Sequence, residues 1–516
     1  MPNQNDAEDR ARERSIALWN ECQAAKRTAL DAGADESQAQ QAAAEVWNAW
    51  ADDMLAKRKA LEDAGKWDVK SEENSETTKW FKESEANFRG VAFRSRLFPK
   101  VNDGRESGKL ISPPPETLRA DGHDICFRGF RFPGVALFDG ARFYGDLRFD
   151  VVRFPCKALF RKAQFFSASW FSGAQFVDGM SFEWAKFLGF TCFDDARLFA
   201  KASFQKASFS KYASFRGTYF YSDTSFRQTK FKHSVSFYEA HFCKGITFVY
   251  ASFNNDVLFS KAHFYGNARF NNASSTSHIY FTNSIFDGVP DFTRAELKLV
   301  PRVDNMRIEA KTRRSLRHRD KDAAAKFRAL KKFAIEQHDY ARELDFFAGE
   351  LKSERFHRHK IWHSVFLFGI AYEVFSNFGR SIWRPLGWWI ASTLSFSAIY
   401  LSQHMEKVEH YSFGLWQFFW GKISDGLFGA SLELSCIDQS ARAVPSEEAI
   451  YLAVQNGLLA IGGDRSGRIK AAYHSLYGET ADIPLIVSYA SIFQMLISAV
   501  LIFLLLLAVR NHFRIK

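Results

Sequence analysis

Few residues of this chain combine the types and the spacing that chemistry at a protein site requires. The group of titratable residues that most resembles a site is His338 and Asp339, with Glu336 and Glu343 close by. On a helix, this spacing gives a solvated face of paired charges more often than a catalytic site. We therefore assign no catalytic role to these four residues.

Other patterns that carry chemistry are missing from the sequence. No glycine-rich phosphate loop precedes a helix, no HExxH or GxSxG run occurs, and no carboxylates are paired at a plausible catalytic spacing. The cysteines form no CxxC pair and accompany no cluster of histidines, so neither a structural zinc site nor a disulfide framework is expected. The sequence thus predicts a protein that is not an enzyme and holds no metal and no cofactor. The cysteines are Cys22, Cys126, Cys156, Cys192, Cys243 and Cys436.

One set of polar residues lies inside a long apolar run near the C-terminus. Ser488, Ser491, Gln494 and Ser498 follow one another at intervals of three and four residues, which places them near one face of a helix. Small and amide side chains at such positions favour the packing of one helix on another within a membrane. A water-lined pore face is the alternative.

Phenylalanine provides the strongest pattern in the chain. Between Phe127 and Phe292 it recurs after five and then six residues for fifteen rounds, with interruptions at Leu198 and Ser275. A period of eleven fits neither an amphipathic helix nor an alternating strand, and an eleven-residue supercoiled helix would scatter these rings around its axis. The period indicates a stacked repeat. The predicted core residues of this repeat are Phe127, Phe132, Phe138, Phe143, Phe149, Phe154, Phe160, Phe165, Phe171, Phe176, Phe182, Phe187, Phe193, Phe204, Phe209, Phe215, Phe220, Phe226, Phe231, Phe237, Phe242, Phe248, Phe253, Phe259, Phe264, Phe270, Phe281, Phe286 and Phe292.

A small side chain precedes most of these phenylalanines by two positions, as Ala158 and Ala163 do. A chain that turns a corner about every five residues directs both the phenylalanine and the small residue inward. Successive coils then bury each phenylalanine on the one a coil away, at the roughly 4.8 Å spacing of hydrogen-bonded strands. A fully buried phenylalanine contributes on the order of 2–3 kcal/mol, so the repeat forms a self-sufficient rod.

The run FRKAQFFSASWFSGAQF (160–176) and its continuation resemble the pentapeptide-repeat family, in its phenylalanine-rich variant with alternating five- and six-residue units. The resemblance implies a right-handed quadrilateral β-solenoid with about 20–22 residues per coil, some seven or eight coils and a length of roughly 35 Å. Leu198 is expected to be a harmless replacement, whereas Ser275 indicates a loosened corner.

Two uncharged runs near the C-terminus predict membrane spans. Residues 483–509 exceed the roughly 20 apolar residues that a span needs, and residues 386–402 are marginal in length. The shorter run gains support from tryptophans at the expected membrane interface, although a buried helix of a soluble protein is the alternative for it. We predict spans near 384–402 and 484–509. The interfacial tryptophans are Trp383, Trp388 and Trp389.

Basic residues flank both predicted spans on the same side. They lie in 352–360, at Arg380 and Arg384, and in 510–516, whereas residues 403–482 contain 6 Lys/Arg against 10 Asp/Glu. The positive-inside rule then puts both termini and the solenoid in the cytoplasm.

Two shorter apolar stretches are not expected to span. Residues 361–376 are interpreted as an interfacial helix, and residues 413–431 as a surface segment or a re-entrant loop.

The runs YEVFSNFGRSIWRPLGWW (372–389) and ISAVLIFLLLLAVRNHFRIK (497–516) resemble the membrane module of many bacterial pentapeptide-repeat proteins. Residues 326–355 resemble the helical connector of those proteins. In those related proteins, the two-span module is often compared with two-helix ion channels that have a pore loop between the helices. Residues 421–435, however, lack the Thr/Gly/Tyr/Gly run of a potassium-selectivity filter. A potassium-selective pore is therefore not expected, and an unselective or gated pore is the remaining channel hypothesis.

The N-terminal residues 8–66 contain helix-favouring stretches. We expect Trp19, Trp47 and Trp50 to dock a helical pair onto the first coil and to cover its open edge, with a partner-binding hairpin as the alternative.

The predicted fold is thus a right-handed quadrilateral β-solenoid of the pentapeptide-repeat type with α-helical segments on both sides and an α-helical transmembrane module. The predicted domains are an N-terminal helical segment (1–75), a linker leading into the solenoid (76–124), the solenoid (125–298), a basic helical connector (299–360) and a membrane module (361–516).

Charge limits the partners. The chain carries a formal charge of +11, and residues 125–295 contain 21 Lys/Arg against 12 Asp/Glu. Some pentapeptide-repeat proteins imitate DNA with an acidic rod and bind topoisomerases in this way. The rod of this chain is basic, which argues against that role. Its aromatic side chains are expected to point inward, which disfavours nucleic acid, and anionic lipid beside the connector is the easier partner.

We therefore predict a membrane-anchored, homo-oligomeric scaffold in the inner (cytoplasmic) membrane of a bacterium. Its solenoid would be presented to an unknown protein partner. A pore regulated by the solenoid is the alternative.

Overall fold

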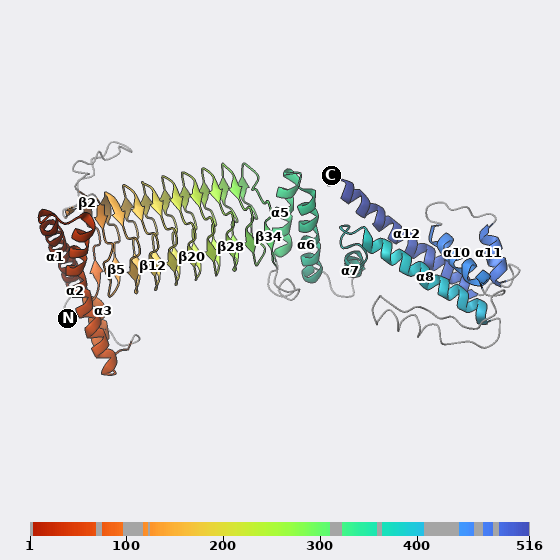
Figure 1. The fold of residues 1–516 in the computed structure, drawn as a ribbon, viewed down its shortest axis with the longest axis horizontal. Coiled ribbons are helices and arrows are strands. Elements are labelled where there is room, and N and C mark those ends of the chain that lie inside the picture. Colours follow the sequence, from red (N-terminus) through yellow and green to blue (C-terminus); the bar gives the residue numbers. More distant parts are fainter. Residues whose placement is uncertain are drawn as a thin grey trace. The chain divides into compact units, whose positions relative to one another are not determined.

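The computed structural model describes residues 4–68, 75–95, 117–121, 124–309, 322–358, 364–406, 443–458, 468–477 and 485–514. These residues belong to two compact units, Met1–Gln337 and His338–Lys516, and each unit is described by itself. The first unit holds a parallel β-solenoid of about nine turns, with helices at both of its ends (Figure 1).

The solenoid has four faces, and each face is one parallel sheet that runs along the stacked coils. Face 1 contains β1 (Ala86–Asn87), β5 (Ala136–Leu137), β9 (Ala158–Leu159), β13 (Met180–Ser181), β17 (Ala202–Ser203), β21 (Thr224–Ser225), β25 (Ile246–Thr247) and β29 (Ala268–Arg269). Face 2 contains β3 (Thr117–Ala120), β2 (Ala92–Ser95), β6 (Arg142–Tyr144), β10 (Gln164–Phe165), β14 (Lys186–Phe187), β18 (Ser208–Phe209), β22 (Lys230–Phe231), β26 (Ser252–Phe253), β30 (Ser274–Ser275) and β33 (Glu296–Leu297). Face 3 contains β4 (Asp124–Cys126), β7 (Asp146–Arg148), β11 (Ser169–Trp170), β15 (Thr191–Cys192), β19 (Ala213–Ser214), β23 (Val235–Ser236), β27 (Val257–Leu258) and β31 (Ile279–Tyr280). Face 4 contains β8 (Arg153–Phe154), β12 (Gln175–Phe176), β16 (Arg197–Leu198), β20 (Tyr219–Phe220), β24 (His241–Phe242), β28 (His263–Phe264), β32 (Ile285–Phe286) and β34 (Arg307–Ile308).

Phenylalanine rings stack on one another from coil to coil. Phe165 pairs in register with Phe187, and their ring centroids lie 4.5 Å apart with planes only 4° from parallel. Rings of opposite faces meet edge to face instead, as Phe160 and Phe171 do at 6.0 Å and 84°. Both arrangements are favoured for aromatic pairs, so each ring is held along the rod and across it.

Two kinds of corner explain why the repeat alternates between five and six residues. After Phe138, the Ala141 N–H donates to the Phe138 carbonyl, and Gly140 has a φ of 68°. This tight corner recurs every eleven residues, mostly with a non-glycine residue in the left-handed region, as at Lys162 and Asp195. The other corners have one residue more, and within 124–309 none of them contains a left-handed residue.

Aspartates at the corners connect neighbouring coils. The Asp139 Oδ1 accepts the Arg161 N–H at 2.8 Å, and the Asp223 Oδ1 accepts the Gly245 N–H at 3.0 Å. Each donor lies one coil further along the chain. These charge-assisted bonds satisfy corner amides that the strands leave unpaired.

Leu198 and Ser275 both keep the register of the repeat. Leu198 is buried and pairs with Phe176 and Phe220. The strand that contains Ser275 pairs on both sides, and the buried Ser275 hydroxyl donates to the Ser277 carbonyl at 2.8 Å. The loosened corner expected at Ser275 is therefore wrong, because a local hydrogen bond satisfies the hydroxyl.

The solenoid is longer than the phenylalanine period alone indicates. Its strands begin at Ala86 and Ala92, within the segment expected to be a linker leading into the solenoid, and they continue to Ile308. Ala86 pairs with Ala136, so the first coil is joined to the second across an insertion of the chain. These outer coils account for about nine turns instead of seven or eight.

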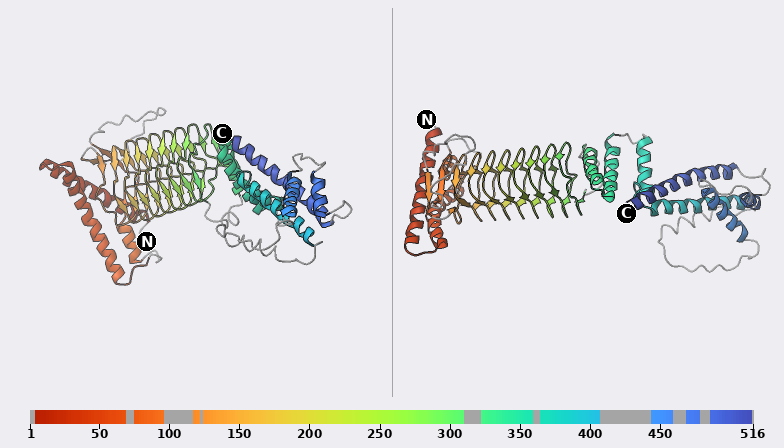
Figure 2. Two further views of the ribbon diagram at one scale, coloured as in Figure 1. Left: turned by 45° about the vertical axis from the view of Figure 1, so that its right-hand side comes forward. Right: turned by 90° about the horizontal axis from the view of Figure 1, so that it is seen from above.

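Helices cover the first coil, as both views in Figure 2 show. They are α1 (Gln4–Asp31), α2 (Glu36–Asp63) and α3 (Glu76–Glu83). Trp19 of α1 lies 4.8 Å from the Phe127 ring, and Trp47 of α2 stacks on Phe130 at 5.4 Å. The expected docking is confirmed for these two tryptophans, whereas Trp50 packs against Trp47 and Arg14.

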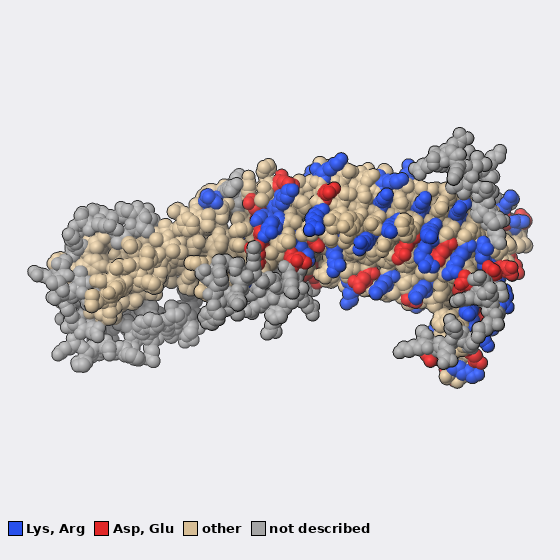
Figure 3. Space-filling model, turned by 180° about the vertical axis from the view of Figure 1, so that it is seen from behind, with Lys and Arg blue, Asp and Glu red and all other residues tan. Residues whose placement is uncertain are grey.

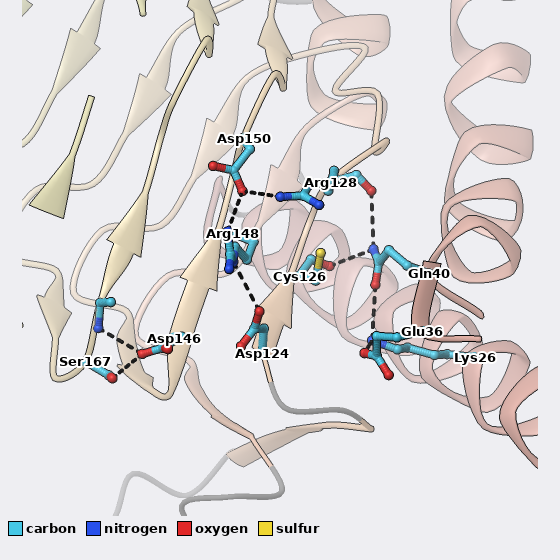
Figure 4. Close-up of polar contacts among 11 residues, drawn as sticks. Lys26, Glu36, Gln40, Asp124, Cys126, Arg128, Asp146, Arg148, Asp150 and Ser167 are labelled. Carbon is cyan, nitrogen blue, oxygen red and sulfur yellow. Dashed lines mark hydrogen bonds and ion pairs between the residues drawn. The ribbon is translucent and has the colours of Figure 1, made fainter. Parts of the chain in front are cut away.

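Polar contacts fix the position of this helical cap (Figure 4). The Gln40 amide donates to the carbonyls of Cys126 and Arg128 at 3.0 and 3.3 Å. Its oxygen accepts from the buried Lys26 ammonium, which also pairs with Glu36 at 2.7 Å. Backbone groups that the first coil leaves without a strand partner are thus satisfied by the cap.

The last coil is covered by α5 (Ala323–Glu336). Phe333 of this helix meets Phe292 edge to face at 5.5 Å, and Phe327 and Leu330 are buried with it. The segment expected to be a connector therefore supplies a second cap within the first unit.

The second unit is helical. Its helices are α6 (Tyr340–Arg358), α7 (Ser364–Ser376), α8 (Trp383–Glu406), α10 (Ala443–Leu458), α11 (Arg468–Tyr477) and α12 (Leu485–Arg514). An apolar core lies between α8, α10, α11 and α12, with Tyr400, Leu452, Tyr477 and Val487 among its buried residues.

Among the described residues, one helix, Leu485–Phe513, is long and apolar enough to cross a membrane, judged by length and composition. It covers the second predicted span. The helix α8 covers the first predicted span but does not reach the same apolarity, so that span stays a prediction. Residues 413–431 and 421–435 lie outside the described residues.

Charged residues connect α6 to α7. Glu373 pairs with Lys352 at 3.0 Å and with Arg355, whose side chain is 6% exposed. Burial alone would raise the pKa of Glu373, but the hydrogen bonds and charges of Arg355 and Lys352 outweigh it and lower that pKa. The carboxylate is therefore ionised at neutral pH and neutralises a buried guanidinium.

Truncation of one core ring should weaken the whole solenoid. We expect Phe204→Ala to destabilise by about 3–5 kcal/mol, because the cavity opens inside a closed stack of rings. Phe199→Ala is the matched control, since Phe199 is 41% exposed on the outer wall. Urea unfolding of the full chain, followed by the circular-dichroism signal of the β-sheet, measures both. Equal losses in the two variants would contradict the inward stack.

Removal of the Glu373 charge should destabilise the helical unit in a pH-dependent way. Because the pKa of Glu373 is lower in the folded state, its stabilisation is present at neutral pH and is lost as the pH falls through that value. Glu373→Gln should therefore melt earlier than the wild type at pH 7, and the difference should shrink below about pH 4. Thermal melts of the helical circular-dichroism signal test this, with Glu447→Gln on the exposed side of α10 as the control. A Glu373→Gln difference that stays constant from pH 7 to pH 3 would refute the assignment.

Candidate functional site

The predicted core phenylalanines lie inside the solenoid. Every one of them, from Phe127 to Phe292, is at most 3% exposed. They are therefore out of reach of any ligand, and only residues that point outward from the four faces are available for contacts.

The described cysteines show no sign of a nucleophile. Burial raises the pKa of the Cys22 thiol to about 12, and it raises the pKa values of Cys126, Cys156, Cys192 and Cys243 as well. Thiols with raised pKa values are poor nucleophiles, because the thiolate is the reactive form. Cys436 lies outside the described residues.

The cluster around His338 has a local structural role. Asp339 precedes α6, and its carboxylate accepts the Arg342 N–H at 3.1 Å and pairs with the Arg342 guanidinium at 3.1 Å. Glu336 pairs with Lys332 at 3.8 Å. Among the described residues, no group of three or more His, Cys, Asp and Glu side chains is placed to hold a metal ion.

The four polar residues of α12 differ in their surroundings. Gln494 and Ser498 are fully buried, whereas Ser488 and Ser491 are half-buried, and the Ser491 hydroxyl donates to the Ser488 carbonyl at 2.8 Å. Gln494 is the centre of a polar network. Its oxygen accepts from the Tyr400 hydroxyl of α8 at 2.7 Å, and its amide donates to the Ala453 carbonyl of α10 at 2.7 Å.

Residues that sequence reasoning missed complete this network. The Asn456 amide donates to the Tyr400 hydroxyl at 3.3 Å, and the Tyr477 hydroxyl of α11 donates to the Tyr400 carbonyl at 2.6 Å. Gly457 allows the close approach of α10, because a Cβ there would lie 3.4 Å from both the Ser498 Oγ and the Trp389 Nε1. The network joins four helices, which agrees with a role of Gln494 in packing.

A groove of about 930 Å³ runs along the corner between faces 4 and 1 of the solenoid. Its floor follows one row of outward residues in register, in which Ser181 pairs with Ser203, Ser203 with Ser225, and Ser225 with Thr247. Because each step is one coil, the floor presents a small hydroxyl about every 4.8 Å.

Charged residues border this groove. Lys157, Lys201, Lys244 and Arg269 line it, against two acidic residues, Glu183 and Asp223. Figure 3 shows that lysine and arginine side chains lie in rows across the solenoid. The groove therefore carries an excess of positive charge.

An exposed column of aromatic residues on face 4 lies next to the groove. Phe199 and Tyr221 are 41% and 37% exposed and stack with centroids 4.9 Å apart, and Tyr265 is 41% exposed and lines the groove itself. The expectation that all aromatic side chains of the rod point inward is thus wrong. These residues directly follow a core position in the chain, where the alternation of a strand directs them outward.

Comparison with known families gives one match. Residues 248–296 match the family model of pentapeptide repeats, with 9 copies of the repeat. Neither a curated protein nor a solved structure matches the chain. The matched segment lies within the parallel β-solenoid, so the repeat part of this chain is similar to the pentapeptide-repeat family in both sequence and fold.

Proposed function

We propose that this protein is a membrane-anchored scaffold whose solenoid presents a binding surface to a protein partner on the cytoplasmic side of a bacterial inner membrane. The observation that carries the proposal is the contrast between the two units. The first is a capped rod with a charged outer wall, and the second has long apolar helices with exposed apolar surface.

The solenoid suits a scaffold because both of its ends are covered. Trp19 and Trp47 pack on the first coil and Phe333 on the last, so strand addition at either end is blocked. The four faces are the surface that remains available to a partner. Their outward-pointing residues can differ from coil to coil without disturbing the core. A rigid wall of this kind binds a partner without ordering its own backbone.

The membrane anchor is supported by apolar side chains of α12 that are exposed in the described part of the helical unit. Only 28% of the apolar stretch of α12 is buried, and Tyr489, Phe493 and Leu496 are among its exposed residues. An exposed apolar patch of this extent fits a lipid environment or a second copy of the chain. This is the basis for proposing a homo-oligomer as well.

A second span at α8 fits the same picture, although its sequence is more polar. The Thr393 and Ser395 hydroxyls donate to the carbonyls of Trp389 and Ala391 within the same helix. Hydroxyls satisfied in this way add little cost inside a bilayer. With two spans, both termini lie on one side, and the basic Arg380, Arg384 and Arg510 lie next to anionic lipid headgroups.

A pore regulated by the solenoid is the second candidate, and the buried polar network around Gln494 is what favours it. The network is closed, however, because Gln494 uses both its oxygen and its amide within the bundle. The packing role is therefore the better supported one.

Insertion of α12 should depend on its exposed apolar face. We expect the full chain to stay in the membrane fraction after an alkaline carbonate wash. The double variant Leu496→Lys/Val500→Lys should be lost from that fraction, because each lysine near the helix centre costs about 3 kcal/mol on insertion. Both residues are exposed in the helical unit, so the change leaves its core intact.

Arg510→Lys is the matched control, because it keeps a positive charge at the end of α12. Release of the wild-type chain by carbonate would overturn the anchor. Planar-bilayer recording of the purified protein separates the two candidates, because reproducible unitary currents would favour the pore over the scaffold.

A further inference from the structure

Three lysines at the groove have no ion-pair partner among the described residues. Lys157, Lys201 and Lys244 are exposed and line the groove between faces 4 and 1. By contrast, Lys261, at the corner between faces 3 and 4, pairs with Glu239 at 3.2 Å. The groove thus holds positive charge that the fold itself does not neutralise.

The two acidic residues of the groove are engaged within the solenoid. The Glu183 carboxylate accepts the Ser203 hydroxyl at 2.8 Å, and the Asp223 carboxylate accepts the Gly245 N–H at 3.0 Å. Both bonds connect neighbouring coils. The acidic residues therefore support the corners, while the lysines face solvent and attract a negatively charged partner.

The spacing of the lysines selects the conformation of that partner. Lys201 follows Lys157 by two coils, and Lys244 lies one residue short of two further coils. Two coils correspond to about 9.6 Å along the rod. A polyproline II segment places every third residue on one side at about 9.3 Å, whereas the same-side residues of a β-strand recur at about 6.6 Å.

The rest of the groove also fits such a segment. The row from Leu159 to Arg269 spans five coil steps, roughly 24 Å, which corresponds to about eight residues in the polyproline II conformation. The hydroxyls of Ser225 and Thr247 offer hydrogen bonds to a backbone in this conformation, which makes no internal hydrogen bonds. Tyr265 lines one end of the groove and supplies an exposed aromatic side chain against which a proline-rich segment can pack.

We infer that the groove between faces 4 and 1 binds an acidic, polyproline II-like segment of a partner protein, with carboxylates at every third residue next to Lys157, Lys201 and Lys244. This inference rests on the proposed scaffold function and names its partner class. Single-stranded nucleic acid fits less well, because Tyr265 is the one aromatic residue among the described residues that line the groove, whereas proteins that bind such strands stack successive bases on several aromatic side chains.

Direct binding tests the inference. The probe is a fluorescent peptide with four Glu-Pro-Pro repeats, and the control peptide has the same composition with its glutamates in one block. Fluorescence anisotropy with the purified full-length protein should show that the repeated peptide binds at least about fivefold more tightly.

Matched variants locate the site. Lys201→Glu should weaken binding of the repeated peptide about tenfold, because it replaces an attractive exposed charge pair by a repulsive one. Lys211→Glu makes the same charge change at an exposed position outside the groove and should leave the affinity unchanged.

Three outcomes would overturn the inference: equal affinity for the two peptides, equal effects of the two variants, or tighter binding of a single-stranded oligonucleotide of the same charge at the Lys201 site. None of them depends on membrane attachment. Loss of the membrane anchor and loss of peptide binding are therefore separate results.

Discussion

The pairing of each coil with the next one is the interaction on which the rest of this molecule depends. A single coil buries almost nothing by itself, whereas a stacked coil gains parallel strand hydrogen bonds, ring-on-ring contacts such as Phe165 with Phe187, and corner bonds from aspartates such as Asp139. Stability is then a sum over neighbours, and the two end coils are the weak points. Both end coils are covered by helices: tryptophans of α1 and α2 pack on the first coil, and Phe333 of α5 packs on the last one.

The stacking of coils also determines which positions of the repeat maintain the fold and which can bind a partner. Inward positions are fixed by the stack, and corner positions are fixed by the alternation of a tight and a wide turn. The outward positions are not constrained by the stack. In this protein, lysines, small hydroxyls and the exposed Tyr265 lie together at the corner between faces 4 and 1. A binding surface on a solenoid therefore appears as a row with a period of twenty-two residues, not as a short motif.

The sequence was sufficient to predict the architecture of the rod, because an eleven-residue period allows few other structures. It was not sufficient to locate the ends. The strands at Ala86 and Ala92 are separated from the later coils by an insertion that hides the period, and α5 carries no repeat at all. The exposed Phe199 and Tyr221 were missed because the core pattern draws attention to inward rings. The partners of Gln494 come from other helices, so only the packed bundle brings Tyr400 and Ala453 to it.

Hydrogen exchange of the full chain, resolved by mass spectrometry, tests the coil-upon-coil account most directly. The account predicts that amides of the first coil, at Ala86 and Phe127, exchange as slowly as those of the central coils while α1 and α2 are present. Deletion of α1 and α2 should speed exchange there first, with a gradient that fades toward the middle of the rod. Fast exchange of the first coil in the intact chain, or an equal increase in every coil after the deletion, would contradict it.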